Sequence, residues 1–277
     1  MLWSLLGLLT AGTGAIPPFQ LTAMAFLLAS GVGALMIYRT GAGYGVLRQP
    51  WPVWALGLYG LFGYHALYFT SQKLAPPAEA GLINSLWPLL IVLFSGLLPG
   101  EHLRARHIIG AVLGFSGIVV LAMGRGGLVF SADAMSGSSA AGYLAALGCA
   151  LVWSSYSVLS RLHSGVPSEV VTGFCAVTSV LSLLCHLTFE TTVWPASLNV
   201  WLCVLAMGIG PVGAAFFLWD HGIKRGDIRL LGTASYGTPV VSTILLVLFG
   251  YAQAHWTLGV ACLLIVGGAV VASRKTQ

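Results

Sequence analysis

The chain of 277 residues carries only 12 Lys or Arg and 7 Asp or Glu side chains. Charged residues are 7% of the sequence, whereas a soluble globular protein contains about 25%. Hydrophobic residues reach 57% and the mean hydropathy is +0.92. These values exclude a soluble domain, a disordered chain and, despite the net charge of +5, a nucleic-acid-binding protein. They indicate a polytopic membrane protein.

Apolar runs separated by polar or Pro/Gly-containing breaks predict ten membrane-spanning helices. A hydrocarbon core of about 30 Å needs roughly 20 helical residues per crossing. The runs lack the alternation of apolar and polar residues that marks the strands of a membrane barrel. We therefore expect an all-α integral membrane fold. The ten expected spans cover residues 1–16, 18–39, 51–72, 77–99, 106–123, 139–162, 168–189, 200–221, 230–250 and 255–273.

The charged residues divide between the two sides of the predicted membrane protein. Ten of the 12 cations fall in one set of loops and the C-terminus, together with four acids, which gives that side a net charge of +6. The opposite loops hold Lys73, Arg125 and three acids, a net charge of −1. Cytoplasmic loops are enriched in Lys and Arg, so the C-terminus is predicted to be cytoplasmic. Asp220 is predicted to close the eighth span beside this cytoplasmic charged loop.

Neither a metal site nor a disulfide framework is expected. The five cysteines are scattered within spans without paired spacing, which is typical of small apolar side chains. His102 and His107, five residues apart, do not share a helix face. We expect no cofactor.

The two halves of the chain resemble each other at an offset of about 150 residues. The segment Asn84-Ser-Leu-Trp-Pro88 is matched by Ser235-Tyr-Gly-Thr-Pro239, and a glycine-spaced span follows each segment. Five spans per half is an odd number, so the second copy is predicted to be inverted relative to the first. We expect two five-helix repeats, residues 1–124 and 139–274. Inverted repeats are a common plan of transporters that bind substrate near the bilayer midplane.

The first predicted span is shorter than its counterpart in the second half. Trp3 is matched by Trp153, but only two residues precede Trp3, whereas the sixth span begins about 13 residues before Trp153. This comparison predicts either that the natural protein starts roughly a dozen residues earlier or that the first turns of the first helix are missing from this chain.

Several segments resemble the drug/metabolite transporter superfamily, EamA type. They are Pro77-Ala-Glu-Ala-Gly-Leu-Ile-Asn-Ser-Leu-Trp-Pro88, Gly100-Glu-His-Leu-Arg104 and the glycine-spaced span that follows. Asn84–Pro88, Val152-Trp-Ser-Ser-Tyr156 and Ser235–Pro239 are most similar to the YddG-type aromatic amino-acid exporters. The resemblance implies a multi-pass protein of the bacterial inner membrane, with the lipid bilayer and a small zwitterionic substrate as its partners. We expect it to act as a monomer.

Matching prolines point to a candidate site. A helical Pro frees the carbonyl four residues earlier, which is the carbonyl of Asn84 for Pro88 and of Ser235 for Pro239. In hydrocarbon such a carbonyl needs a partner unless it lines a watery cavity, and a substrate ammonium group would supply one. The alternative is a kink that a neighbouring helix satisfies.

Deep aromatic residues and a histidine extend this candidate site. Trp and Tyr side chains suit an aromatic ligand, although they also fill contacts between helices. His65 is the one ionisable group that the sequence places clearly within a span, so it is a candidate for proton coupling. The alternative is a neutral His that forms a hydrogen bond and lines the cavity. The expected substrate-binding residues are Tyr64, His65, Tyr68, Asn84, Trp87, Pro88, Trp153, Tyr156, Ser235, Tyr236, Thr238 and Pro239.

The function predicted from the sequence is secondary transport. No metalloprotease, hydrolase or phosphate-loop motif is present, so we expect neither an enzyme nor an ATP-binding subunit. The leading hypothesis is export of aromatic and other neutral amino acids from the cytoplasm by alternating access. The alternatives are export of a drug or another small metabolite, a channel, or a membrane scaffold that transports nothing.

Overall fold

The computed structural model describes residues 2–75, 77–100, 102–123, 137–250 and 253–273. Five of the charged residues used to predict the topology lie outside these ranges: Glu101, Arg125, Asp133, Arg274 and Lys275. The expected all-helical fold is confirmed for the described residues, which contain no strand.

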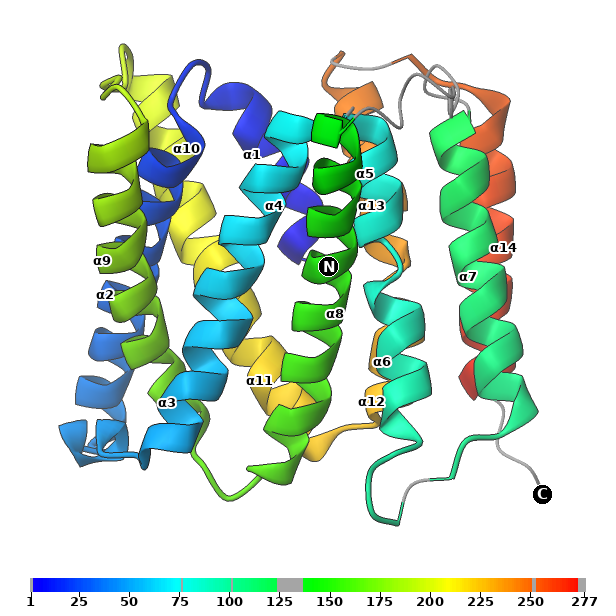
Figure 1. Cartoon of the computed structure of the whole chain (residues 1–277), viewed down its shortest axis with the longest axis horizontal. Helices are drawn as coiled ribbons and strands as arrows, with labels where there is room; N and C mark the ends of the chain where they lie inside the picture. Colours follow the sequence, from blue (N-terminus) through cyan, green and yellow to red (C-terminus); the bar gives the residue numbers. More distant parts are fainter. Residues whose placement is uncertain (1, 76, 101, 124–136, 251–252, 274–277) are drawn as a thin grey trace.

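The helices follow one another as rods that run up and down a single bundle (Figure 1). The π-helices are labelled η like the 3-10 helices. In chain order the elements are η1 (Leu2–Ser4), α1 (Leu5–Gly12), α2 (Pro18–Thr40), η2 (Tyr44–Leu47), α3 (Trp51–Leu58), η3 (Tyr59–Gly63), α4 (Tyr64–Leu74), α5 (Pro77–Asn84), α6 (Trp87–Ser95), α7 (Ala105–Met123), α8 (Gly137–Leu162), η5 (Ser168–Val170), α9 (Val171–Phe189), α10 (Leu198–Ile209), η6 (Gly210–Ala214), α11 (Ala215–Arg225), α12 (Ile228–Ala234), α13 (Gly237–Leu248) and α14 (Trp256–Ser273).

In the part of the chain that the structure describes, six helical stretches are long and apolar enough to cross a membrane. Among the described residues, Leu2–Gly12, Ala80–Ser95 and Trp256–Ala272 form shorter apolar helices. The six long stretches are Pro18–Thr40, Ala105–Met123, Ser139–Leu162, Ser168–Phe189, Leu198–Arg225 and Ile228–Leu248.

Two helices form a pair at one edge of the bundle, where α7 and α14 stand side by side (Figure 1). A Cβ added at Gly110 would lie 2.5 Å from the Gly268 carbonyl oxygen, and one added at Gly268 would lie 2.5 Å from the Gly110 oxygen. The two backbones therefore touch. Without a hydrophobic drive between helices in lipid, small residues that permit such contact hold helices together. The glycine spacing of both spans thus serves packing within the chain.

Helix irregularities recur at matching positions in the two halves. Two single-turn π-helices, Tyr59–Gly63 and Gly210–Ala214, interrupt otherwise continuous helices, and they are 151 residues apart. Two further breaks separate α5 from α6 at residues 85–86 and α12 from α13 at residues 235–236. Pro211 lies within the second of these π-helices. The π-helix at Tyr59–Gly63 contains no proline, so the sequence did not reveal it.

A carboxylate from a distant segment caps the N-terminus of α2. The Glu190 oxygens accept hydrogen bonds from the backbone N–H groups of Phe19 (3.0 Å) and Gln20 (3.1 Å). His186 lies 3.0 Å from Glu190 through Nδ1, and its Nε2 lies 2.9 Å from the Thr192 hydroxyl. The side chain of Glu190 is only 4% exposed. Pro17 precedes α2 and offers no side-chain cap to the helix, which begins at Pro18. Glu190 therefore supplies the missing acceptors and binds α2 to the end of α9.

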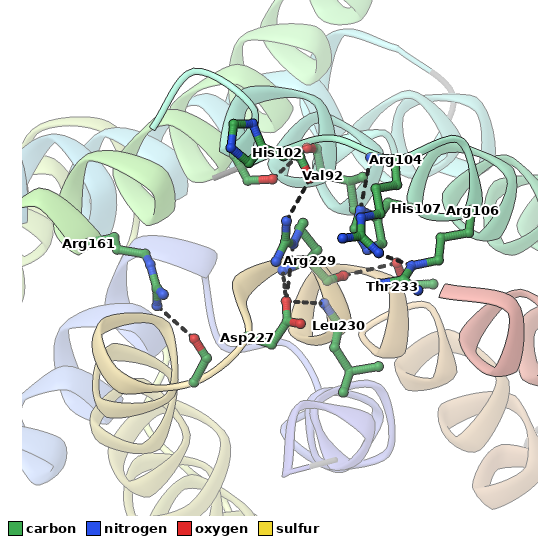
Figure 2. Close-up of polar contacts among 12 residues, drawn as sticks. Val92, His102, Arg104, Arg106, His107, Arg161, Asp227, Arg229, Leu230 and Thr233 are labelled. Atoms are coloured by element: carbon green, nitrogen blue, oxygen red, sulfur yellow. Dashed lines mark hydrogen bonds and ion pairs between the residues drawn. The ribbon is translucent and has the colours of Figure 1, made fainter. Parts of the chain in front are cut away.

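The end of the bundle away from the N-terminus of α2, at the bottom of Figure 1, includes the loops at residues 41–50, 96–100, 102–104, 163–167 and 226–227. We call this end the basic face. There the Arg229 guanidinium donates to the carbonyl of His102 at 2.9 Å (Figure 2). Asp227 caps α12 by accepting from the N–H groups of Arg229 and Leu230. Burial raises the pKa of the Asp227 carboxyl, but these hydrogen bonds and the Arg229 charge outweigh it and bring the pKa below its usual value. Arg229 thus joins the α6–α7 loop to α12.

We expect Glu190→Gln to lower the melting temperature of the detergent-purified protein. The substitution removes the charge and one of the two acceptors at the N-terminus of α2, and loss of such a cap costs about 0.5–2 kcal/mol. Thermal unfolding of the wild type and the variant measures the effect. Glu169→Gln, at the half-buried acid near the other end of α9, is the matched control. An equal shift in both variants would contradict the capping role.

Candidate functional site

Two adjoining cavities lie inside the bundle. The first, which we call the tryptophan cavity, has a volume of about 180 Å³, and its walls include Trp3, Trp87, Trp153 and Phe216. The second, the tyrosine cavity, has a volume of about 340 Å³ and extends past Tyr68 and Asn84 to the α1–α2 connection at Thr13 and Gly14. Leu6, Tyr64, His65 and Val212 line both. The α1–α2 connection lies at the end of the bundle away from the basic face (Figure 1).

An aromatic cluster forms the wall of the tryptophan cavity. Trp153 is 4% exposed, and its ring centroid lies 5.6 Å from that of Trp3 and 6.0 Å from that of Trp219. Trp87 meets Trp3 and Trp219 edge-on at 6.3 Å and 5.6 Å. Each such pair contributes about 0.5–1.5 kcal/mol beyond the burial of its area. The rings come from helices far apart in sequence, and they form an apolar surface suited to a flat aromatic group.

The two π-helices lie beside residues that line the cavities. Tyr64 and His65 directly follow η3, while Pro211 and Val212 lie within η6 and Phe216 follows it. The extra residue in a π-turn rotates the following side chains relative to an α-helix, and such bulges are frequent at functional sites. The π-helices therefore decide which side chains face the interior.

Gly60 lets η3 pack against α8. A Cβ added at Gly60 would overlap the ring of Tyr156, which is only 2% exposed. Tyr156 in turn contacts the Trp153 ring at 5.4 Å. The close approach of backbone to ring thus fixes the distance between the π-helix and the aromatic cluster.

Tyr64 and Asn84 form the main polar pair of the tyrosine cavity. The Asn84 Nδ2 donates to the Tyr64 hydroxyl at 3.0 Å. Within the described part of the chain, the buried Oδ1 of Asn84 has no hydrogen-bond partner. The Tyr64 ring lies parallel to that of Tyr68, with centroids 6.1 Å apart. A buried acceptor without a partner is costly, and Asn84 is one of the residues that line the tyrosine cavity.

His65 lies among aromatic rings. Its ring meets Phe26 edge-on at 5.0 Å and lies 6.2 Å from the ring of Phe216. Nδ1 is 2.7 Å from the carbonyl oxygen of Leu61. A carbonyl only accepts hydrogen bonds, so Nδ1 carries a hydrogen and donates it.

The structure therefore brings seven of the residues predicted from the sequence to these two cavities: Tyr64, His65, Tyr68, Asn84, Trp87, Trp153 and Thr238. Ser235 and Thr238 line a third cavity beside Trp3 and Trp219. Tyr156 lines a small cavity nearer the basic face, together with Ser160 and Asp220. These placements are compatible with a substrate site, which remains a prediction.

Three other residues predicted to bind substrate, Pro88, Pro239 and Tyr236, are not among the residues that line the two cavities. Pro88 is buried, and its carbonyl oxygen would lie 3.2 Å from a Cβ at Gly232. The Pro239 carbonyl accepts from the Thr243 hydroxyl at 2.8 Å. Tyr236, 1% exposed, belongs to a core cluster outside both cavities, packs on Gly114 and accepts the Leu89 N–H at 3.1 Å.

One of the two carbonyls freed by proline has a local partner. The carbonyl of Ser235 accepts the N–H of Thr238 at 3.0 Å, so a ligand is not required to satisfy it. A backbone group at the other break, between α5 and α6, also has a partner within the protein. There the hydroxyl of Tyr236 accepts the N–H of Leu89.

Several residues that line the cavities were not predicted from the sequence, and the position of one acid was predicted incorrectly. Trp3, Phe26 and Phe216 line the cavities; the match between Trp3 and Trp153 was the signal available for one of them. Asp220, predicted to close its span beside a charged loop, lies in α11 and is 2% exposed. It pairs with Lys224, one turn later, at 2.8 Å. This pairing offsets part of the cost of burying either charge.

Long apolar helices around an aromatic interior are typical of a multi-pass membrane protein. The sequence profile of the EamA-like transporter family matches residues 1–123 and 140–274. The chain therefore belongs to the EamA-like transporter family.

The aromatic amino acid exporters YddG are similar to this chain. The one from Ancylobacter novellus is 56% identical over 274 residues, which are 99% of this chain and 93% of the exporter. The one from Salmonella typhimurium is 26% identical over 254 residues, 88% of this chain and 84% of that protein. A solved crystal structure with 56% identity superposes with a TM-score of 0.92 and covers 98% of this chain and 93% of that one.

Gly60→Ala is expected to destabilise the protein, because the new methyl group would overlap the Tyr156 ring and separate η3 from α8. Gly63→Ala, in the same π-helix, is the matched control, since its nearest atoms lie 4.0 Å away. Thermal unfolding in detergent should show a lower melting temperature for Gly60→Ala alone. Equal melting temperatures for the two variants would contradict the role of this contact.

Proposed function

We propose that the protein is a secondary exporter of aromatic and other neutral amino acids, which it moves out of the cytoplasm by alternating access. The observation that carries this proposal is the pair of cavities, which combine tryptophan walls with uncharged polar groups at the helix breaks. The similarity to the YddG exporters supports the same substrate class.

The proposed architecture has ten spans in two inverted five-helix repeats, residues 1–124 and 139–274. Two features support it: the family profile matches twice, and the π-helices recur 151 residues apart. Discontinuous helices at corresponding positions of two repeats are a frequent place for a transporter's substrate site. In this arrangement the seven cavity residues named above bind substrate near the bilayer midplane.

The proposed orientation puts the basic face and the C-terminus in the cytoplasm of a bacterial inner membrane. Cations at the cytoplasmic ends of the spans support this orientation. The tyrosine cavity then extends toward the outer face, while Tyr156, Asp220 and Lys224 lie between the tryptophan cavity and the cytoplasm. This arrangement corresponds to a state that faces outward and is closed to the cytoplasm.

For the transported substrate there is one specific alternative to an aromatic amino acid. A relative from Pseudomonas aeruginosa that is 28% identical over 194 residues, 68% of this chain and 64% of that protein, is named a pseudopaline exporter. Members of the family with this fold thus differ in cargo. The tryptophan walls favour an aromatic substrate here.

Purified protein reconstituted in liposomes should release labelled tryptophan, phenylalanine and threonine faster than empty vesicles. We expect Trp87→Ala and Trp153→Ala to reduce tryptophan flux at least about tenfold, because each variant removes several ring contacts with the substrate. Trp256→Ala is the control, since that side chain is 70% exposed at the end of α14.

No flux of any amino acid above empty vesicles would contradict the proposed function. The remaining hypotheses would then be a membrane scaffold that transports nothing and an exporter of another substrate. Full flux in both cavity variants would contradict the proposed site.

A further inference from the structure

A buried ion pair lies in α11, at the end of the helix nearer the basic face. Asp220 and Lys224 are one helical turn apart, and Nζ of Lys224 lies 2.8 Å from Oδ2 of Asp220. Their side chains are only 2% and 6% exposed, respectively. The ammonium group of Lys224 also donates to the carbonyl of Val166, beyond the end of α8, at 3.1 Å. The protein therefore encloses one charge of each sign on the same face of one helix.

This pair lies next to the aromatic wall of the tryptophan cavity. Asp220 directly follows Trp219, whose ring centroid lies 5.6 Å from that of Trp87. Tyr156 contacts the ring of Trp153 at 5.4 Å, and it lines a small cavity together with both members of the ion pair. In the proposed orientation, a substrate that comes from the cytoplasm passes these two charges before it reaches the tryptophan cavity.

Packing alone does not account for a buried ion pair at this place. Taking charges out of water costs several kcal/mol per ion, and apolar side chains of similar size often replace such a pair without loss of stability. Ionisable groups inside membrane proteins commonly pair with one another and mark the pathway of a substrate or an ion. None of the described residues that line the tryptophan and tyrosine cavities is Lys, Arg, Asp or Glu. An opposite charge for a charged substrate group therefore has to come from outside those cavities.

A zwitterion matches the pair in sign and in spacing. An α-amino acid carries its ammonium and carboxylate groups on the same carbon atom, and side chains one turn apart on a helix lie about 5–6 Å apart at their Cβ atoms. The ammonium group can therefore pair with Asp220 while the carboxylate pairs with Lys224. One ion pair is exchanged for two, so no buried charge is left without a partner. A ligand with a single charge leaves one member of the pair unpaired, which is costly.

The ion pair is closed on itself in this structure. The small cavity beside it has a volume of about 10 Å³, roughly the space that one water molecule needs. Arg161 of α8 donates to the carbonyls of Ile223 (2.6 Å) and Gly226 (2.7 Å) and so holds the end of α11 against α8. A substrate can reach the pair from the basic face only when α8 and α11 separate there. Alternating access requires such a movement at the cytoplasmic side.

We propose that Asp220 and Lys224 form an entry site for zwitterionic amino acids at the cytoplasmic end of the pathway. When this end opens, Asp220 binds the ammonium group of the substrate and Lys224 binds its carboxylate. The ring of the substrate then moves on to the tryptophan cavity, and the pair closes again behind it. The inference rests on the proposed function, because it adds a charged entry site to the same pathway.

Competition against the flux of labelled tryptophan in proteoliposomes tests the role of each charge. Tryptamine keeps the ring and the ammonium group, while indole-3-propionate keeps the ring and the carboxylate. Lys224→Gln removes the partner of the carboxylate, so the ratio of the two inhibition constants should move at least about tenfold in favour of tryptamine, the typical effect of losing a hydrogen bond to a charged group. Asp220→Asn should move the ratio at least about tenfold in favour of indole-3-propionate. A loosened helix end would affect both ligands alike.

Two matched controls remove a charge of the same sign from the same end of the bundle. Arg225→Gln removes an exposed cation next to Lys224, and Glu169→Gln removes a half-buried acid near the start of α9. Neither should change the ratio of the inhibition constants. A shift in the controls as large as in the two variants would show a general effect of the charge of the basic face, and it would overturn the inference.

A double variant covers the case in which the single variants do not fold. Each single variant leaves one buried charge without its partner, which costs stability. Asp220→Asn combined with Lys224→Gln removes both charges, and the glutamine keeps a donor for the carbonyl of Val166. Gel filtration should show a folded protein, and the KM for tryptophan should rise at least about tenfold. A folded double variant with the KM of the wild type would overturn the inference.

The results also separate the inference from the proposed function. If the wild type moves tryptophan but both single variants shift the ratio in the same direction, or do not shift it, the entry site is wrong and the proposed function stands. If the wild type moves no amino acid, the proposed function fails and the entry site fails with it. Opposite shifts in the two single variants would support both.

Discussion

The structure depends on one constraint: inside a bilayer no backbone N–H or C=O group can be left to water, so every helix break needs a partner built into the fold. Glu190 meets this requirement at the N-terminus of α2, where proline leaves the helix without a cap. Tyr236 meets it at the break between α5 and α6 by accepting the N–H of Leu89. Each partner comes from a distant part of the sequence, so the satisfaction of local backbone groups also fixes how the helices stand relative to one another.

The same breaks shape the interior. Because α3 and α10 each continue through a π-turn, the side chains that follow, among them Tyr64, His65 and Phe216, turn toward the cavities. Gly60 then allows Tyr156 to lie against the π-helix, and Tyr156 supports Trp153. The helix irregularities, the aromatic cluster and the cavities therefore depend on one another. A change in the packing of one of them is expected to alter the positions of the others.

Charge is excluded from the centre and concentrated at the ends. Asp220 and Lys224 are buried nearer the basic face and pair with each other. None of the described residues that line the tryptophan cavity is charged. Arg229 and Asp227 hold the loops of that face together. The centre is left with hydroxyls, an amide, an imidazole and aromatic rings.

The amino-acid sequence determined the class of the protein. Apolar runs, sparse charges and the matched Asn84–Pro88 and Ser235–Pro239 segments were enough to predict an all-helical membrane protein of this family and to select Tyr64, His65, Trp87 and Trp153. These features are local, since hydropathy and proline act along a helix. Only the tertiary structure decided that Tyr236 packs against Gly114, that Asp220 is buried beside Lys224 and that Phe216 faces His65. The physical reason is that a helix exposes every side chain in turn, and only the neighbouring helices decide which of them face a cavity.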